Sequence, residues 1–368
     1  MRIAFYAPLK PPDHPVPSGD REIARLFLEA LGRAGHEPFV ASRMRSFDGA
    51  GDAKHQARIA ALSQRTTERL LRQWRELPEA APEMWFTYHL YYKAPDRLGP
   101  AVSAALGIPY VVAEASYAAK RATGPWADGH RAVKRALRRA DAVIGLNSAD
   151  RDGVLPLLRD PGRWVALPPF LDTAAYPARE PRRAEAPRLI AVAMMRQGDK
   201  LASYRVLGAA LAQLLDVPWA LDIVGDGPAR RDVEAALAPL GPRVTYRGAL
   251  GDKGVAAALA QADLFVWPAI NEAFGMALLE AQASGLPVVA GASGGVGDIV
   301  LPGTTGLLAP PGDADAFASA VRRLIQDPAA RAAMGLAAAQ KVRREHDLPI
   351  AAARLAGLID ALGRKRAA

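Results

Sequence analysis

The sequence predicts an α/β protein with two domains, each built on a parallel sheet. Short apolar runs rich in strand formers alternate with helix-forming runs along most of the chain, an order typical of parallel βαβ units. The 368 residues, half of them apolar, exceed what one typical core holds. Residues 173–187 contain three prolines and mixed charges but little apolar material. We therefore predict an N-terminal domain over 1–172 and an interdomain linker over 173–187.

The N-terminal part begins with a strand at 2–8 and a helix at 21–34, which Ser18 or Asp20 can cap. A long basic helix is expected over 53–77. Its apolar side can cover a core or lie on a membrane surface, and it consists of Ile59, Leu62, Leu70 and Trp74. Further strands are expected at 35–41, 84–89, 108–114, 141–148 and 164–168.

The second domain is expected to begin near Arg188 with a strand over 189–194. A polar loop that holds Arg196 and Lys200 precedes its first helix, which runs through Leu215. Later strands and helices are expected as follows: strands near 221–224, 244–248, 263–267, 286–290 and 305–308; helices at 274–283, 316–325 and 348–362.

Composition excludes several classes of site. The chain has no cysteine, which removes disulfides, thiolate catalysis and cysteine-ligated zinc. The six histidines are scattered, so none suggests a metal pair. The apolar stretch at the N-terminus is too short for a signal peptide, and no run is long enough to span a bilayer. A soluble or peripheral protein of a reducing cytoplasm is expected.

Positive charge is concentrated in the N-terminal domain. Residues 1–171 contain 25 Lys and Arg against 18 Asp and Glu, whereas residues 188–368 contain 19 against 17. Such asymmetry suggests an anionic partner, such as a membrane surface or a lipid phosphate; alternatively, the arginines decorate solvated helix faces. No nucleic-acid-binding motif is present, so nucleic acid is not an expected partner.

The stretch 267–289 places two glutamates in a βαβ unit. Glu272 lies in the loop that opens the helix over 274–283, and Glu280 lies eight residues further along. Such a loop binds anions because unpaired N–H groups and the helix dipole point at the ligand. Eight helical residues rise about 12 Å, which matches the span from a sugar across a diphosphate to a ribose. Alternatively, Glu272 caps the helix and Glu280 is a solvated charge.

This stretch resembles the signature of family 4 of the retaining glycosyltransferases, in which two glutamates separated by seven residues precede a Gly-x-Pro-Val strand. The matching residues are Glu272, Phe274, Gly275, Glu280, Ala281, Gly285, Pro287 and Val288. The resemblance implies the GT-B architecture, with two Rossmann-like domains whose parallel sheets face across a cleft. It places the second domain at 188–345 and a helix that crosses back to the first domain at 346–368.

The resemblance also implies an activity. A hexosyl group would move from a nucleoside-diphosphate sugar to a glycan, glycolipid or small-molecule acceptor, with retention of configuration and without a metal or cofactor. The first domain would bind the acceptor, and the second would bind the donor. We expect a cytoplasmic enzyme of polysaccharide or glycolipid biosynthesis, with possible peripheral association at the inner membrane.

Site residues carry over by position. Arg196 and Lys200 would clamp the diphosphate, Glu272 would orient sugar hydroxyls and Glu280 would hold the ribose. His89 would either contact the sugar or be structural. The remaining donor-binding candidates are Gly19, Gly225, Arg247, Gly248, Phe274, Gly275 and Met276. The sequence departs from the family pattern at Pro169-Phe170, Leu201 and Gly297-Asp298.

Three alternative interpretations bear on the function. The pair Asp313 and Asp315 resembles a metal-binding Asp-x-Asp, but it opens a helical run and is expected to cap it. A nicotinamide-dependent oxidoreductase would show Gly-x-Gly-x-x-Gly after the first strand, where Gly19 stands alone. A non-catalytic sugar-nucleotide or carbohydrate-binding relative would keep the same recognition residues.

Overall fold

The computed structural model describes residues 1–16, 18–177 and 186–367. They form two compact units, one of Met1–Pro168 with Leu348–Ala368 and the other of Pro169–Asp347. Most of the predicted linker, 178–185, lies outside the described residues. Leu171 belongs to the second unit because its backbone N–H donates to the His346 carbonyl at 3.0 Å. The His346 ring also bonds the Pro169 carbonyl, with 2.7 Å between Nδ1 and O.

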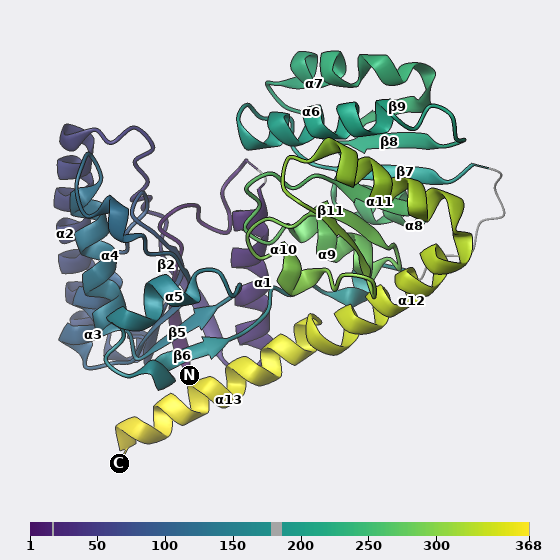
Figure 1. Ribbon diagram of the computed structural model, residues 1–368. Coiled ribbons are helices and arrows are strands. Elements are labelled where there is room, and N and C mark those ends of the chain that lie inside the picture. The colour runs from purple at the N-terminus through teal and green to yellow at the C-terminus, as the bar shows by residue number, and fades with distance from the viewer. Residues whose placement is uncertain (17, 178–185, 368) are drawn as a thin grey trace. The chain divides into compact units, whose positions relative to one another are not determined.

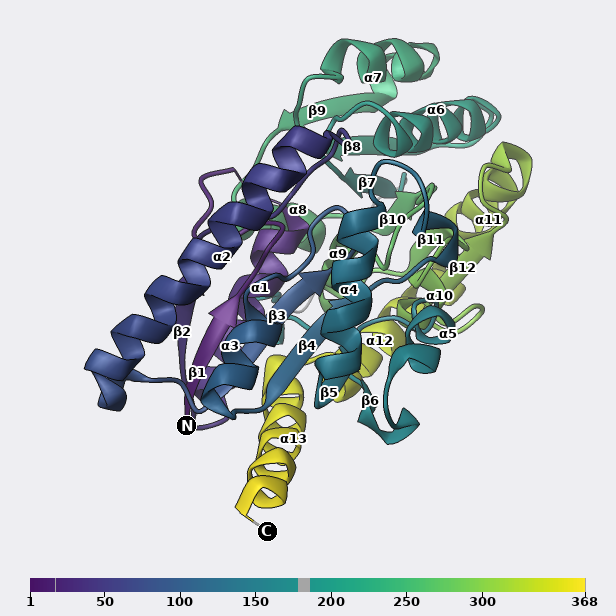
Figure 2. The same cartoon turned by 90° about the vertical axis from the view of Figure 1, so that its left-hand side faces the viewer.

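The first unit contains a six-stranded, all-parallel sheet in the order β2-β1-β3-β4-β5-β6 (Figure 1, with all six strands labelled in Figure 2). The strands are β1 Arg2–Tyr6, β2 Glu37–Ser42, β3 Met84–Leu90, β4 Tyr110–Ala115, β5 Ala142–Gly145 and β6 Trp164–Ala166. The helices are α1 Gly19–Arg33, α2 Ala53–Glu76, α3 Gly99–Leu106, α4 Ala127–Arg139, α5 Arg151–Val154 and α13 Leu348–Ala367.

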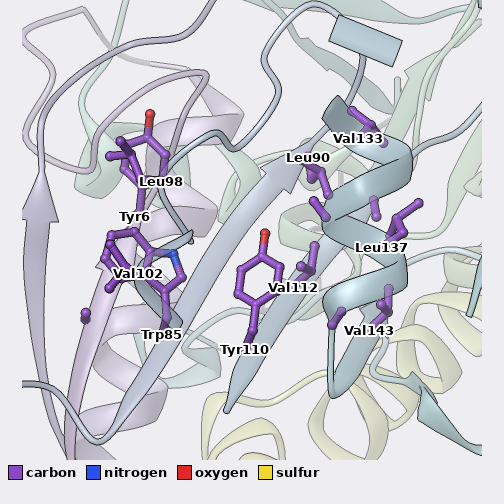
Figure 3. Close-up of a cluster of buried hydrophobic side chains, with 14 of the residues drawn as sticks. Tyr6, Trp85, Leu90, Leu98, Val102, Tyr110, Val112, Val133, Leu137 and Val143 are labelled. Atoms are coloured by element: carbon purple, nitrogen blue, oxygen red, sulfur yellow. The ribbon is translucent and has the colours of Figure 1, made fainter. Parts of the chain in front are cut away.

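Helices cover both faces of this sheet. Helices α2, α3 and α4 lie together over one face (Figure 2). Their apolar side chains pack on Trp85, Tyr110 and Val112 of the sheet, as the close-up shows for Val102, Val133 and Leu137 (Figure 3). On the other face Phe27 of α1 packs against Phe86 of β3, with ring centroids 5.4 Å apart. Helix α13 contacts α1.

Of the two residues predicted to cap α1, Ser18 does so. It accepts a hydrogen bond from the Arg21 N–H, whereas Asp20 is directed to His89. The apolar side of α2 was predicted incorrectly at Leu62, which is 44% exposed. The buried stripe runs instead through Ile59, Leu70 and Trp74 with small polar residues between them, because Leu62 falls at the edge of the 3.6-residue repeat.

The second unit repeats the architecture. Its six parallel strands follow the order β12-β11-β10-β7-β8-β9. Their bounds are β7 Arg188–Val192, β8 Ala220–Val224, β9 Val244–Gly248, β10 Leu264–Trp267, β11 Val288–Gly291 and β12 Gly306–Ala309. The helices are α6 Asp199–Ala212, α7 Arg230–Leu237, α8 Asp252–Ala260, α9 Met276–Ala283, α10 Val296–Ile299, α11 Ala314–Gln326 and α12 Pro328–Glu345. Helix α6 contacts α7 and α11, and α9 contacts α8 and α12.

The aspartate pair before α11 stabilises the start of that helix. Asp313 caps α11 by accepting from the Ala316 N–H, and Asp315 accepts a hydrogen bond from the Gln213 side chain at 2.8 Å. The capping interpretation is therefore confirmed for Asp313, while Asp315 lies in the first turn of α11. Within the described ranges, no helix is both long and apolar enough to cross a membrane.

Candidate active site

The carboxyl ends of β7 and β8 bring two loops into close contact. A Cβ at Gly225 would lie 1.9 Å from the Ala193 carbonyl oxygen, and one at Gly227 would lie 2.3 Å from that of Met195. The Met195 N–H donates to the Asp226 carbonyl at 2.9 Å. Glycine at 225 is therefore required by the packing of these loops, which fixes the backbone that leads into Arg196.

The turn after β10 holds Glu272 in a strained backbone. Ala269 and Asn271 both have positive φ, 54° and 51°, a conformation that costs free energy outside glycine and is concentrated at functional sites. Side chains of the first turns of α6 secure the turn. The Ile270 N–H donates to Ser203 Oγ at 3.0 Å, and the Asn271 amide donates to Asp199 at 2.9 Å.

A second loop packs directly on this turn. Gly294, with φ of 51°, approaches so closely that a Cβ would lie 2.1 Å from the Glu272 carbonyl oxygen. The Gly295 N–H donates to the Ala273 carbonyl at 2.6 Å. The loop before α10 and the turn before α9 therefore form one connected surface at the carboxyl edge of the sheet.

Glu272 and Lys200 form an ion pair at this edge. Lys200 Nζ donates to Glu272 Oε2 at 2.5 Å, and the Lys200 and Glu272 side chains are 27% and 18% exposed, respectively. The indole N–H of Trp267 donates to the same oxygen at 3.3 Å, and the Lys200 ammonium lies 5.4 Å from the Trp267 ring centroid. Trp267 thus contacts both members of the pair.

Three neighbouring candidates lie on or beside α9. Glu280 is half-buried within the helix, and Phe274 is buried just before it. Gly275, with φ of 77°, is the N-cap residue and Met276 is the first helical residue. The Glu272 carboxylate accepts from Lys200 and Trp267, and the N-cap residue of α9 is Gly275, which argues against the alternative in which Glu272 is merely the helix cap.

Arg196 and Arg247 differ in their surroundings. Arg196 is exposed in the loop after β7. Arg247 of β9 forms two hydrogen bonds to the buried Asp222 carboxylate, at 3.3 and 3.2 Å. Its guanidinium is therefore held against β8. At the next residue, Gly248, φ is 70° and an added Cβ would meet no heavy atom within 4 Å, so the backbone there is accessible.

In the first unit, His89 is held between two carboxylates. Its Nδ1 lies 3.0 Å from Asp20 Oδ1 and 3.9 Å from Glu114 Oε2. Burial acts to lower the pKa of His89, but the charges of Glu114 and Asp20 outweigh it and raise the pKa to about 9. The ring is therefore an imidazolium at neutral pH.

The neighbouring Gly19 begins α1, and a Cβ at this position would meet no other heavy atom within 4 Å. Packing within the first unit therefore does not require glycine there. Asp20 and Glu114, which position His89, were not among the predicted site residues. Asp20 carried a signal, since it follows Gly19 at a helix start, but Glu114 has the sequence context of an ordinary strand end. Trp267 was likewise missed, because its contacts with Glu272 and Lys200 arise only when the turn folds back.

Among the described residues, no cluster of three or more His, Asp or Glu side chains is arranged to hold a metal ion. The charged side chains described above, at the carboxyl edges of the two sheets, include a lysine paired with one carboxylate and a histidine held between two. In α/β proteins this edge is where ligands bind. Fixed cations there suit a substrate that develops negative charge.

Comparison with known proteins identifies the family. The glycosyl transferases group 1 family matches residues 186–327. The alpha-D-kanosaminyltransferase of Streptomyces kanamyceticus is 30% identical over 260 residues, which cover 66% of this chain and 66% of that protein. The chain thus spans just under two thirds of that relative.

Solved structures share the fold along nearly the whole chain. Sucrose-phosphate synthase from Thermosynechococcus elongatus superposes with a TM-score of 0.77 at 22% identity, covering 99% of this chain and 100% of that one. Anabaena HepE in complex with UDP-glucose gives a TM-score of 0.72 at 17% identity, covering 98% and 100%. The architecture is GT-B, and residues 186–327 match the glycosyl transferases group 1 family.

Proposed function

We propose that the protein is a metal-independent, retaining hexosyltransferase that uses a nucleoside-diphosphate sugar. The observation that carries the proposal is the Lys200–Glu272 pair at the carboxyl edge of the second sheet, in the family's signature turn. A diphosphate offers Lys200 a more highly charged partner than Glu272. Binding would therefore draw the ammonium to the phosphates and leave the carboxylate to accept hydrogen bonds from sugar hydroxyls.

The proposed chemistry needs no covalent intermediate. The bond from the anomeric carbon to the leaving phosphate oxygen breaks as an acceptor hydroxyl oxygen bonds the same carbon from the same face. The hydroxyl proton passes to the departing phosphate oxygen. Arg196 and Lys200 stabilise the charge that develops on the diphosphate, Glu280 holds the ribose, and the His89 imidazolium donates a hydrogen bond to the sugar.

HepE has been solved with UDP-glucose, so UDP-glucose is the first donor to test, alongside GDP- and ADP-sugars. We expect the protein to release UDP from UDP-glucose, slowly with water and faster with an acceptor, and to retain this activity in EDTA. Lys200→Ala should lower turnover by a factor corresponding to about 2–4 kcal/mol. Binding of donors without release of nucleoside diphosphate would indicate a non-catalytic relative instead.

We further propose a glycan or lipid-linked acceptor and peripheral association with the cytoplasmic side of a membrane. Support comes from the charge excess of residues 1–171 and from exposed arginines on α4 such as Arg131, Arg135 and Arg138. Each basic residue near an anionic surface contributes about 1 kcal/mol. Sedimentation with anionic vesicles at low salt tests this, and no binding there would refute it.

A further inference from the structure

A row of aromatic rings follows β3 away from His89. The His89 and Tyr91 ring centroids are 5.0 Å apart, those of Tyr91 and Tyr92 5.7 Å, and those of Tyr92 and Trp126 5.7 Å. Tyr91 and Tyr92 lie just after the end of β3, and Trp126 immediately precedes α4. Figure 3 shows that end of β3, at Leu90, beside the first turns of α4, at Val133.

Two cations lie over the last two rings of this row. Lys93 Nζ is 5.0 Å from the Trp126 centroid and 5.9 Å from that of Tyr92. The Arg121 guanidinium is 5.0 Å from the Tyr92 centroid and 5.9 Å from that of Trp126. Both side chains are half-buried. Two like charges are thus held on the same pair of rings, an arrangement that a bound anion would stabilise.

The nearby acids do not neutralise these cations. The Asp48 carboxylate accepts from the Ala50 and Gly51 N–H groups and from the Gln56 side chain. Asp128 is paired with Arg97 and Arg131. In the described part of the chain, neither Lys93 nor Arg121 forms an ion pair. A small pocket beside Lys93 is lined by Tyr92, Arg97 and Trp126, and also by Asp48 and Gln56; Arg121 is not part of its lining.

The platform under the cations is rigidly built. The Trp126 indole N–H donates to the Asp48 carbonyl at 3.0 Å, and the Gln56 amide donates to the Pro125 carbonyl at 2.8 Å. A Cβ at Gly129 would lie 2.1 Å from the Tyr92 carbonyl oxygen, so the first turn of α4 is fixed against Tyr92. Such restraint lowers the conformational entropy that these side chains would lose when a ligand binds.

We infer that Lys93 and Arg121, held on Tyr92 and Trp126, form an acceptor subsite that binds a phosphate group. The assignment of this subsite to the acceptor rests on the proposed function, whereas the binding of phosphate does not. A lysine and a guanidinium held on the same two rings suit a phosphate monoester or diester, and the row of rings leading back to His89 offers stacking surface to a sugar. The phosphate belongs either to a phosphorylated sugar or to a lipid headgroup.

The test compares Lys93→Gln/Arg121→Gln with a charge-matched control, Arg323→Gln/Arg343→Gln, which removes two exposed arginines of α11 and α12 in the second unit. Glucose 6-phosphate and glucose are titrated into each full-length protein and followed by NMR. We expect wild type and control to prefer glucose 6-phosphate, and the Lys93/Arg121 variant to bind it at least tenfold more weakly. Phosphatidylglycerol and phosphatidylcholine vesicles form the second arm.

If the Lys93/Arg121 variant loses binding of glucose 6-phosphate, the phosphate belongs to a phosphosugar. If it loses binding of phosphatidylglycerol vesicles alone, the phosphate belongs to a lipid headgroup. The inference is overturned if the Lys93/Arg121 variant keeps wild-type binding to both phosphate probes, or if the control loses as much as the variant does. Trp126→Leu, which removes a ring but no charge, should also weaken phosphate binding. Failure of wild type to release UDP from UDP-glucose would refute the proposed function. It would not affect the phosphate-binding inference, because the binding measurements need no turnover.

Discussion

His89 combines an unusual backbone with an unusual charge. Its φ is 63°, and the φ of Glu114, at the end of the next strand, is 56°. Both residues therefore adopt a left-handed conformation at neighbouring strand ends, which turns their side chains toward each other and toward Asp20. The resulting pKa of about 9 makes His89 a hydrogen-bond donor on both ring nitrogens throughout the physiological range.

We predict that donor turnover falls as the pH rises through about 9, because His89 then loses its proton. Asp20→Asn should move this limb of the pH–rate profile to lower pH, since one of the two supporting carboxylates is lost. His89→Asn should abolish it. The raised pKa of His89 also stabilises the fold, with the same dependence on pH. This contribution to the free energy of unfolding is complete below about pH 6.5, the ordinary pKa of histidine, and is lost as the pH rises through about 9. An unmoved limb in Asp20→Asn would contradict the assignment.

Glu272 and Glu280 should separate by role. Glu272→Gln frees Lys200 from its ion pair, so UDP should bind at least as tightly as to wild type while turnover of the intact donor falls. Glu280→Gln should mainly weaken UDP itself, because it would remove a contact to the ribose. Calorimetry with UDP alone, followed by turnover of UDP-glucose, measures both effects. Equal losses of UDP affinity in the two variants would show that the division is wrong.

Among the helices and strands of the first unit, Asp96 organises the start of α3. It is 1% exposed, and its Oδ1 accepts from the Leu98 and Gly99 N–H groups at 2.8 Å. Its Oδ2 accepts from the Thr87 hydroxyl and the Tyr110 hydroxyl. One buried carboxylate thus joins β3 and β4 to the start of α3 by accepting four hydrogen bonds.

Asp96→Ala should destabilise the first unit by about 3 kcal/mol or more, because two buried hydroxyls and two helix N–H groups lose their acceptor at once. Asp313→Ala is the matched control, since it removes an exposed helix-capping aspartate and should cost about 1 kcal/mol. Urea unfolding followed by circular dichroism gives both values. Similar costs for the two variants would mean that the network contributes little beyond capping.

The sequence predicted most elements because apolar runs, prolines and glycines specify them locally. It started α9 two residues early, at Phe274, because a helix-forming composition does not reveal the positive φ of Gly275. It could not predict the Lys200–Glu272 pair, whose partners lie 72 positions apart and meet only when β7 and β10 become neighbours. The contacts of Trp267 could not be predicted for the same reason, since they also depend on tertiary structure.

Along the chain as a whole, the two units differed in how well their sites could be predicted. The family match, at residues 186–327, lies within the second unit, where a contiguous motif contains Glu272 and Glu280. In the first unit Asp20, His89 and Glu114 come from three separate segments, a helix start and two strand ends. The resemblance supplied His89, but its carboxylate partners required the order of β1, β3 and β4 in the sheet.

The two units should respond to different ligands. We predict that UDP slows hydrogen exchange in loops of the second unit, at 193–200, 268–276 and 293–298, because these surround Lys200 and Glu272. Glucose 6-phosphate should instead protect 91–97 and 119–130, which contain Lys93, Arg121 and Trp126. Exchange followed by mass spectrometry on the intact chain measures both sets of peptides in one experiment, and the Lys93→Gln/Arg121→Gln variant should lose only the second. Protection of 91–97 by UDP with none at 268–276 would reverse the assignment of donor and acceptor to the two units.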